Sequence, residues 1–168
     1  MAKTNPARLT LLGRTDAKIP ASPAPACLET FPNPARRNYR IHFETDDFTS
    51  VCPITGQPDF ARIDIDYVPD RFCIESKSLK FYLASYRNER AFNEAVTNRI
   101  LDDFVKACRP RQAIVTAQFS ARGGMALTVR AEYPDKIRSS KSENRQSGSD
   151  RDPKQIRITE TPNSETTR

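Results

Sequence analysis

Histidine is nearly absent from this chain: its 168 residues include one histidine, and none of its four cysteines forms a Cys-x-x-Cys pair with another. A protein zinc site is usually built from three or four histidine, cysteine or carboxylate ligands, and a disulfide framework shows paired cysteines at regular spacings. The sequence therefore predicts neither a zinc site nor a disulfide scaffold, and we expect the protein to use no metal.

Long apolar runs are missing as well. No stretch is long enough to span a bilayer, and the N-terminal residues lack the apolar core and small-residue cleavage site of a secretion signal. We therefore expect a cytoplasmic protein with no membrane partner. The chain also lacks Gly-x-Gly-x-x-Gly, the motif with which Rossmann domains bind dinucleotides, so any nucleotide cofactor must be bound in another way.

The chain carries a modest excess of positive charge. Its 27 lysine and arginine residues against 21 aspartate and glutamate residues give a formal net charge of +6. Such a balance suits a nucleic acid or a phosphorylated cofactor as partner, but a solvated basic surface explains it as well. Charge alone therefore leaves both an enzyme and a basic RNA-binding module open.

Both ends of the chain are poor in large apolar side chains. Residues 1–30 include the proline-rich run KIPASPAPA, and residues 135–168 are mostly polar and charged. Segments of this composition bury too little apolar surface to offset the entropy lost on ordering. We therefore predict a flexible N-terminal segment over 1–30, one folded domain over 31–134 and a disordered tail over 135–168. A core of roughly 100 residues often needs an oligomer to cover its sheet and close its site.

Between these ends the apolar residues follow strand and helix periods. Alternating runs predict strands, and apolar residues at four-residue spacing predict helices. The order is strand, strand, helix, helix, strand, strand, which is typical of an α+β fold with an antiparallel four-stranded sheet and both helices on one face. The predicted strands span residues 37–48, 61–67, 112–119 and 125–133, and the predicted helices span 76–88 and 91–107.

The segment CPITGQPDF, residues 52–60, lies between the first two predicted strands. Its two prolines and its glycine predict a rigid turn rather than a helix or a central strand. Such a turn could hold Cys52 as a nucleophile and Asp59 as a proton donor for covalent catalysis. On spacing alone, a small buried thiol beside an ordinary turn is the more common arrangement.

A second motif, ESKSLKFY, opens the first predicted helix. Lys77 and Lys80 lie three residues apart and share a helix face, and two amines near a helix N-terminus would suit a phosphate group. Glu75 could accept hydrogen bonds from a ligand, or it could simply complement the helix dipole. An amphipathic helix with solvated lysines remains the alternative.

Taken together, CPITGQPDF, ESKSLKFY and the later Arg122-Gly-Gly turn resemble the 7-cyano-7-deazaguanine reductases, the QueF family of NADPH-dependent nitrile reductases in queuosine (tRNA modification) biosynthesis. The resemblance runs from about residue 28 to residue 124. It implies the tunnelling (T-fold) architecture, in which β-β-α-α-β-β subunits assemble into rings, here a homo-oligomer of two stacked pentamers. It also implies NADPH as cofactor, 7-cyano-7-deazaguanine as substrate and no direct nucleic-acid partner.

The resemblance further implies roles for single residues. Cys52 would attack the nitrile carbon to form a thioimide, and Asp59 would protonate the nitrile nitrogen, for which it must carry a proton inside an apolar pocket. The residues implied to contact the substrate are Ile74, Glu75, Ser76, Asn93 and Glu94, and those implied to lie near the NADPH phosphates are Lys77, Lys80 and Arg122.

One residue departs from the family pattern. Asn93 stands where these reductases usually have histidine, and asparagine can form hydrogen bonds but cannot relay protons near neutral pH. This leaves open a related activity of the archaeosine type, in which an amine attacks the thioimide and an amidine forms. For His42 we expect a structural or surface role. The remaining cysteines, expected to be structural, are Cys27, Cys73 and Cys108.

Overall fold

The computed structural model describes residues 9–11 and 18–135. The rest of the expected N-terminal segment, and all but the first residue of the expected C-terminal tail, lie outside the described residues. In chain order the elements are the 3₁₀ helix η2 (Pro25–Cys27), β1 (Thr30–Pro32), β2 (Ile41–Val51), β3 (Pro58–Val68), β4 (Phe72–Ile74), α1 (Ser76–Ala84), the 3₁₀ helix η3 (Ser85–Asn88), α2 (Asn93–Cys108), β5 (Gln112–Arg122) and β6 (Met125–Tyr133).

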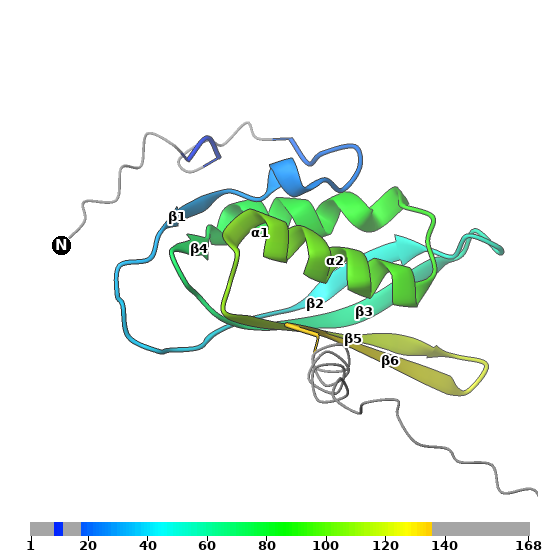
Figure 1. Cartoon of the computed structure of the whole chain (residues 1–168). Coiled ribbons are helices and arrows are strands. Elements are labelled where there is room, and N and C mark those ends of the chain that lie inside the picture. Colours follow the sequence, from blue (N-terminus) through cyan, green and yellow to red (C-terminus); the bar gives the residue numbers. More distant parts are fainter. Residues whose placement is uncertain (1–8, 12–17, 136–168) are drawn as a thin grey trace, which may run out of the picture. The chain divides into compact units, whose positions relative to one another are not determined.

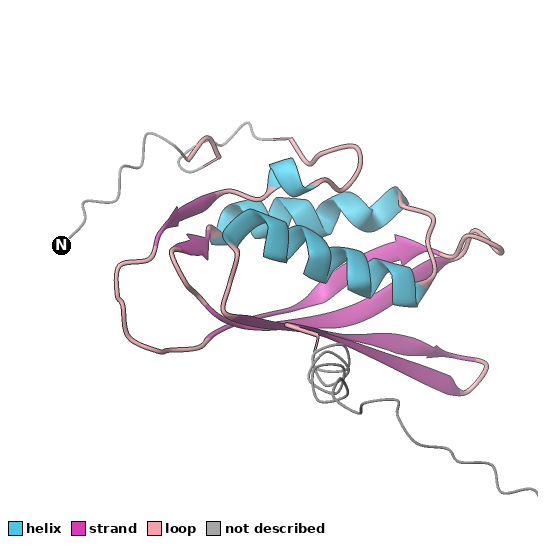
Figure 2. Cartoon of the chain, viewed as in Figure 1, coloured by secondary structure: helices cyan, strands magenta, loops and turns pink. Residues whose placement is uncertain are grey.

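A four-stranded antiparallel sheet in the order β2-β3-β5-β6 forms the floor of the domain. Both helices lie side by side on one face of this sheet, and no helix or strand of the described residues covers the other face (Figures 1 and 2). The α+β architecture expected from the sequence is thereby confirmed, with the predicted order of the main elements.

The core lies between the helices and the sheet because two different periods meet there. Every second residue of β3 and β5 faces the helices, so that Ile63 is 1% exposed, while Tyr67 and Val115 are fully buried. Ile100 and Phe104, four residues apart on α2, are fully buried against them. The rings of Tyr67 and Phe104 meet edge to face with their centroids 4.9 Å apart. Burial of these apolar faces is the main force that holds the layers together.

The structure corrects the predicted course of the motif at residues 52–60. Strand β3 begins at Pro58, so Asp59 and Phe60 belong to an inner strand of the sheet and not to the turn. The prediction that no part of this motif enters a central strand was wrong for these residues. Pairing with β5 begins only at Ala61, while Pro58 pairs with Val51 of β2 alone. A proline is tolerated there because it is the first residue of the strand.

Two further details differ from the expected pattern. The first helix ends at Ala84 and continues as η3, and the second spans Asn93–Cys108, so the predicted ranges were right in place but not at their ends. The short pair β1-β4 forms a separate two-stranded sheet that was not predicted. Such three-residue strands pair distant segments and carry no periodic signal of their own.

Packing extends upstream of residue 31. Leu28 is 7% exposed and belongs to the core cluster. The guanidinium of Arg99 on α2 donates to the carbonyl oxygen of Pro23 at 2.6 Å. None of the helices in the described part of the chain combines the length and the apolar character that a bilayer-spanning segment needs.

Candidate active site

Cys52 lies in a tight turn directly after β2. The Cys52 amide donates to the carbonyl oxygen of Gln57 at 2.9 Å, and the Gly56 amide donates back to the carbonyl oxygen of Cys52 at 3.0 Å. Gly56 has φ +70°, a conformation that a side chain disfavours. A Cβ atom at this position would lie 3.5 Å from Nη2 of Arg90, so the turn also brings a guanidinium close to its backbone.

The turn activates the thiol of Cys52, which is partly exposed. Hydrogen bonds from the side chain of Thr55, and then from the backbone at Thr55 and Ile54, lower the pKa of Cys52 from 9.0 to about 7, although desolvation and the charge of Asp59 oppose this. The thiolate is the nucleophilic form of cysteine. A substantial fraction of the Cys52 side chain is therefore in the reactive thiolate form near neutral pH.

Asp59 lies close by on β3 and points to the face that the helices cover. Its side chain is 9% exposed, and its Oδ1 lies 2.8 Å from Nη2 of Arg122, the last residue of β5. The same guanidinium donates to the carbonyl oxygen of Pro58. Arg122 thus contacts both the Asp59 carboxylate and the first residue of β3.

The N-terminus of α2 is held at the same end of the sheet. The Val51 amide donates to the carbonyl oxygen of Glu89 at 2.9 Å, and the Ala91 amide donates to the carbonyl oxygen of Val51 at 3.2 Å. This short parallel bridge joins the end of β2 to the segment that leads into the helix. Asn93 then opens α2, and Glu94 is exposed in its first turn. Within one chain, the expected nucleophile, the expected acid, Asn93 and Glu94 therefore lie at the same end of the sheet.

The residues of the second motif lie at the opposite end of the sheet. The Ile74 amide donates to the hydroxyl of Tyr67 at 3.2 Å, and Tyr67 pairs with Ile41 at the start of β2. Cys52 follows the far end of β2, where Val51 pairs with Pro58. At a strand rise of about 3.3 Å per residue, the two ends are roughly 30 Å apart. Within one chain the two sets of expected residues are therefore not brought together.

Glu75 acts as the N-cap of α1. Its carboxylate accepts from the Lys77 amide at 2.9 Å and from the Ser78 amide at 2.7 Å, and the residue is 6% exposed. The structure thus gives Glu75 a capping role at the helix N-terminus, where the sequence analysis had offered a helix-dipole role as the alternative to ligand binding. The Lys77 amine donates to the carbonyl oxygen of Leu11 at 2.7 Å. Ser76 and Lys80 are exposed and line a cavity of about 310 Å³ between α1 and β2.

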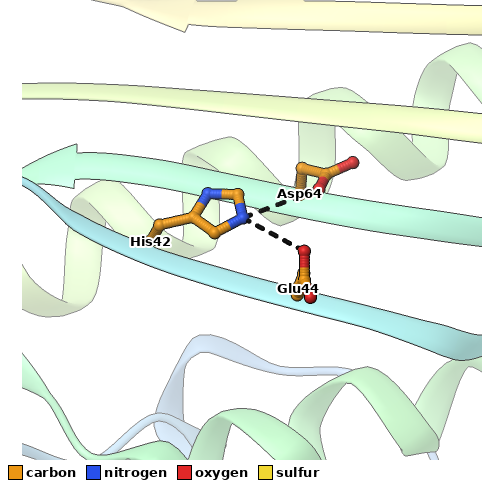
Figure 3. Close-up of side chains that lie close together, drawn as sticks. All are labelled: His42, Glu44 and Asp64. Atoms are coloured by element: carbon orange, nitrogen blue, oxygen red, sulfur yellow. Dashed lines mark hydrogen bonds and ion pairs between the residues drawn. The ribbon is translucent and has the colours of Figure 1, made fainter.

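His42 belongs to a different cluster, on the face of the sheet that looks away from the helices (Figure 3). Its Nε2 lies 3.5 Å from Oε2 of Glu44 and 3.7 Å from Oδ1 of Asp64. Arg62 pairs with both carboxylates, at 2.5 Å and 3.3 Å, and the charges of Asp64, Glu44 and Asp46 raise the pKa of its guanidinium. This exposed ion-pair network agrees with the surface role expected for His42.

The other cysteines have different surroundings from Cys52. Cys73 and Cys108 are buried, and burial raises the pKa of the Cys108 thiol to about 12. Cys27 is partly exposed. Sequence reasoning overlooked Thr55, although it stands inside the first motif and a hydroxyl three residues after a cysteine is within reach in a tight turn.

The fold and the site together define an α+β protein of the T-fold class, with an activated cysteine beside a buried carboxylate. A family model described as "QueF-like protein" matches residues 58–138. The NADPH-dependent 7-cyano-7-deazaguanine reductase of Nitrosomonas europaea is 59% identical over 110 residues, which cover 65% of this chain and 79% of that protein. The reductase of the same name from Syntrophus aciditrophicus is 54% identical over 138 residues, which cover 79% of this chain and 94% of that protein.

A solved structure gives the same result at the level of the fold. The crystal structure of the archaeosine synthase QueF-Like in the apo form has a TM-score of 0.50 and 25% sequence identity, and the match covers 56% of this chain and 91% of that one. The chain belongs to the family of NADPH-dependent 7-cyano-7-deazaguanine reductases.

Proposed function

We propose that this protein reduces the nitrile group of 7-cyano-7-deazaguanine to the aminomethyl group of 7-aminomethyl-7-deazaguanine, in the biosynthesis of queuosine. The single observation that carries the chemistry is the Cys52 thiol, with its pKa lowered to about 7 in a turn that ends at the strand of Asp59. Relatives that cover most of the described domain bear the name of this activity.

The first step is covalent addition. The Cys52 thiolate attacks the nitrile carbon, the carbon–nitrogen triple bond becomes a double bond, and Asp59 gives its proton to the nitrogen, so that a thioimide and a carboxylate result. Addition of the thiol divides a difficult reduction into easier steps. Arg122, 2.8 Å from Asp59, stabilises the carboxylate that this step leaves behind.

The purine-like ring of the substrate needs hydrogen-bond acceptors at its N–H edge. Glu94 is exposed in the first turn of α2 and offers two carboxylate oxygens, beside Asn93 with an amide that both donates and accepts. Both residues stand at the end of the sheet that holds Cys52. We assign the ring to this position, and we assign Ile74, Glu75 and Ser76 of a second chain to the other side of the substrate.

When bound, NADPH would supply the hydride for each of the two reduction steps. The donor set expected for its phosphates is chemically suitable, because Lys77 and Lys80 carry amines and Arg122 carries a guanidinium. In one chain, however, Arg122 ends β5 near Cys52, while α1, which carries the two lysines, starts at the other end of the sheet. The set therefore converges only where two copies of the chain meet, which supports the ring-shaped homo-oligomer of stacked pentamers inferred from the family.

The two-chain site can be tested by complementation. We expect Cys52→Ala protein and Lys77→Ala/Lys80→Ala protein to be inactive when each is alone. Subunits exchanged between the two should recover part of the activity, because some mixed interfaces then hold an intact set of residues. Failure to recover activity after proven subunit exchange, measured by native mass spectrometry, would contradict a shared site.

The activity itself is tested in two stages. Incubation with 7-cyano-7-deazaguanine and no cofactor should add the mass of the substrate to Cys52, and addition of NADPH should then be followed by its oxidation. Cys52→Ala should abolish both signals, and Cys27→Ala serves as the matched control that keeps them. An adduct without any NADPH oxidation would overturn the reductase proposal, and an amidine in place of the amine would point to the archaeosine-type reaction.

A further inference from the structure

The hydroxyl of Ser50 is the one buried side-chain oxygen or nitrogen in the described part of the chain that has no hydrogen-bond partner. Ser50 is fully buried, two residues before Cys52. Leaving a buried hydroxyl without a partner costs free energy, and an alanine of nearly the same shape would avoid that cost. The position of this hydroxyl next to the candidate nucleophile therefore requires an explanation.

Ser50 lies directly opposite Asp59. The two residues are paired across β2 and β3, and both point to the face that the helices cover, as do their buried neighbours Phe48 and Ala61. Side chains in such a pair have their Cβ atoms about 4.5–5.5 Å apart. A change of rotamer is enough to bring a serine hydroxyl and an aspartate carboxyl within hydrogen-bond distance at this separation.

The groups that surround Asp59 differ in charge: a cation lies on one side of its carboxyl and a neutral hydroxyl on the other. On one side Arg122 of β5 lies 2.8 Å away and can only donate, so it stabilises the charged form. The Cys52 turn lies beside the start of β3, and its thiolate opposes a second negative charge nearby. Arg90 lies over Gly56 of the same turn. Ser50 is the neutral neighbour of Asp59, and its hydroxyl can donate to a carboxylate or accept from a carboxylic acid.

We propose that Ser50 is a positioning residue for Asp59, whose hydroxyl accepts a hydrogen bond from the protonated carboxyl before the proton passes to the substrate nitrogen. Ser50 itself is fully buried, so it acts through Asp59. As the proton leaves and the charge appears, Arg122, which already lies 2.8 Å from Oδ1 of Asp59, stabilises the carboxylate. This role rests on the proposed nitrile chemistry, because it needs Asp59 to deliver a proton.

The test uses the half-reaction without cofactor, in which the thioimide is followed by absorbance or by mass over a range of pH. We expect Ser50→Ala to slow adduct formation at neutral pH about tenfold, the effect of one lost hydrogen bond. Ser50→Thr, which keeps the hydroxyl, should restore the rate of adduct formation.

Folding is controlled by urea denaturation of the same proteins. Ser50→Ala should be as stable as the wild type or more stable, since it removes an unpaired buried hydroxyl. Ser85→Ala is the matched control, because the buried Ser85 hydroxyl donates to the carbonyl oxygen of Tyr82 at 2.6 Å. It should lose stability and keep the wild-type rate of adduct formation.

Two results would overturn the role of Ser50 alone: adduct formation by Ser50→Ala at the wild-type rate, or no recovery of the rate in a stably folded Ser50→Thr protein. Absence of an adduct in the wild-type protein would overturn the proposed nitrile chemistry, and the role of Ser50 with it.

Discussion

The guanidinium of Arg122 lies 2.8 Å from the carboxylate of Asp59, measured from Nη2 to Oδ1. The contact is made possible by an irregularity in the pairing of β5 with β6 between Phe119 and Arg122, directly before the turn formed by Gly123 and Gly124. Family resemblance places Arg122 near the cofactor phosphates, but in the free chain this cation is bound to the acid. Arg122 could therefore serve two functions in the reaction: stabilising the Asp59 carboxylate and binding the cofactor phosphates.

An Arg122 variant assayed without NADPH tests its function toward Asp59 apart from its function toward the cofactor. We expect Arg122→Gln to slow formation of the Cys52 adduct in the absence of NADPH, because Asp59 loses the cation that stabilises it after proton transfer. The stability of the protein should fall by about 1 kcal/mol, a modest effect because 39% of the Arg122 side chain is exposed. Stopped-flow absorbance and urea denaturation measure the two quantities.

The matched comparison is the double variant Asp59→Asn/Arg122→Gln. With no carboxylate to stabilise, loss of the arginine should cost little further stability, and a double-mutant cycle reports the coupling. Normal adduct formation in Arg122→Gln together with weakened NADPH binding would show that Arg122 serves only the cofactor.

The lowered pKa of Cys52 predicts the pH dependence of its reactivity. The thiolate fraction rises as the pH passes the thiol pKa, so the rate of alkylation by iodoacetamide should rise with a midpoint near pH 7 and level off above it. Thr55→Val removes the side-chain hydrogen bond that contributes most to this shift, and its midpoint should move up toward 9.0. Peptide mapping by mass spectrometry follows the modification of Cys52.

The experiment is best done on a Cys27→Ser background, because Cys27 is the other partly exposed thiol while Cys73 and Cys108 are buried. Thr49→Val, on the neighbouring β2 strand, is the control for loss of a threonine hydroxyl. An unchanged midpoint in Thr55→Val would contradict activation of Cys52 by the turn.

Gly56 is expected to be sensitive to the smallest side chain. Gly56→Ala forces alanine to φ +70° and places its Cβ atom 3.5 Å from the guanidinium of Arg90. The substitution should cost about 1 kcal/mol of stability, the usual penalty for a side chain in the left-handed region. The midpoint of Cys52 alkylation should rise, since the turn that holds Thr55 against the thiol is distorted.

Gly124→Ala is the matched control for Gly56→Ala. Gly124 has φ +80°, but nothing lies within 4 Å of the position of its Cβ atom. A similar loss of stability with an unchanged alkylation midpoint is expected. A raised midpoint in both variants would show that the effect on the thiol is not local to the Cys52 turn.

Substitutions of Glu75 test whether this residue has a structural role, a binding role or both. Its carboxylate accepts from two backbone amides at the start of α1, so Glu75→Ala should lower the free energy of unfolding by about 1 kcal/mol. Glu94→Ala removes an exposed acid from the first turn of α2 and should cost only about 0.3 kcal/mol, the low end of a helix-dipole effect. Thermal and urea denaturation provide the values.

The role of Glu75 in binding has a separate readout. Glu75→Gln keeps one acceptor oxygen for the cap, so most of the stability should remain. If Glu75 of one chain also contacts the substrate bound in another, this variant should raise KM more than it lowers kcat. Wild-type KM in a stable Glu75→Gln protein would limit Glu75 to its role as a cap.

Periodicity in the sequence was enough to predict the layers of the fold. The alternation of Ile63, Ile65 and Tyr67 and the four-residue spacing of Val96, Ile100 and Phe104 predict a strand and a helix that bury these faces against each other, and all six side chains are at most 1% exposed. The boundary at Pro58 could not be predicted in this way, because it depends on the pairing of Pro58 with Val51 of β2. The same holds for the β1-β4 pair, which joins segments far apart in the chain.

By itself, the sequence determined which chemical groups the protein has: the Cys52 thiol, the Asp59 carboxyl and the cations of Lys77, Lys80 and Arg122, in motifs specific enough to identify the family. Only the tertiary structure decided which of these groups meet. Strand register places Arg122 on Asp59 and Ser50 opposite it, while the two lysines lie on α1, which starts at the other end of the sheet. The contact of Arg122 with Asp59 depends on strand pairing and on the irregularity between Phe119 and Arg122, and the spacing of residues along the chain does not reveal either.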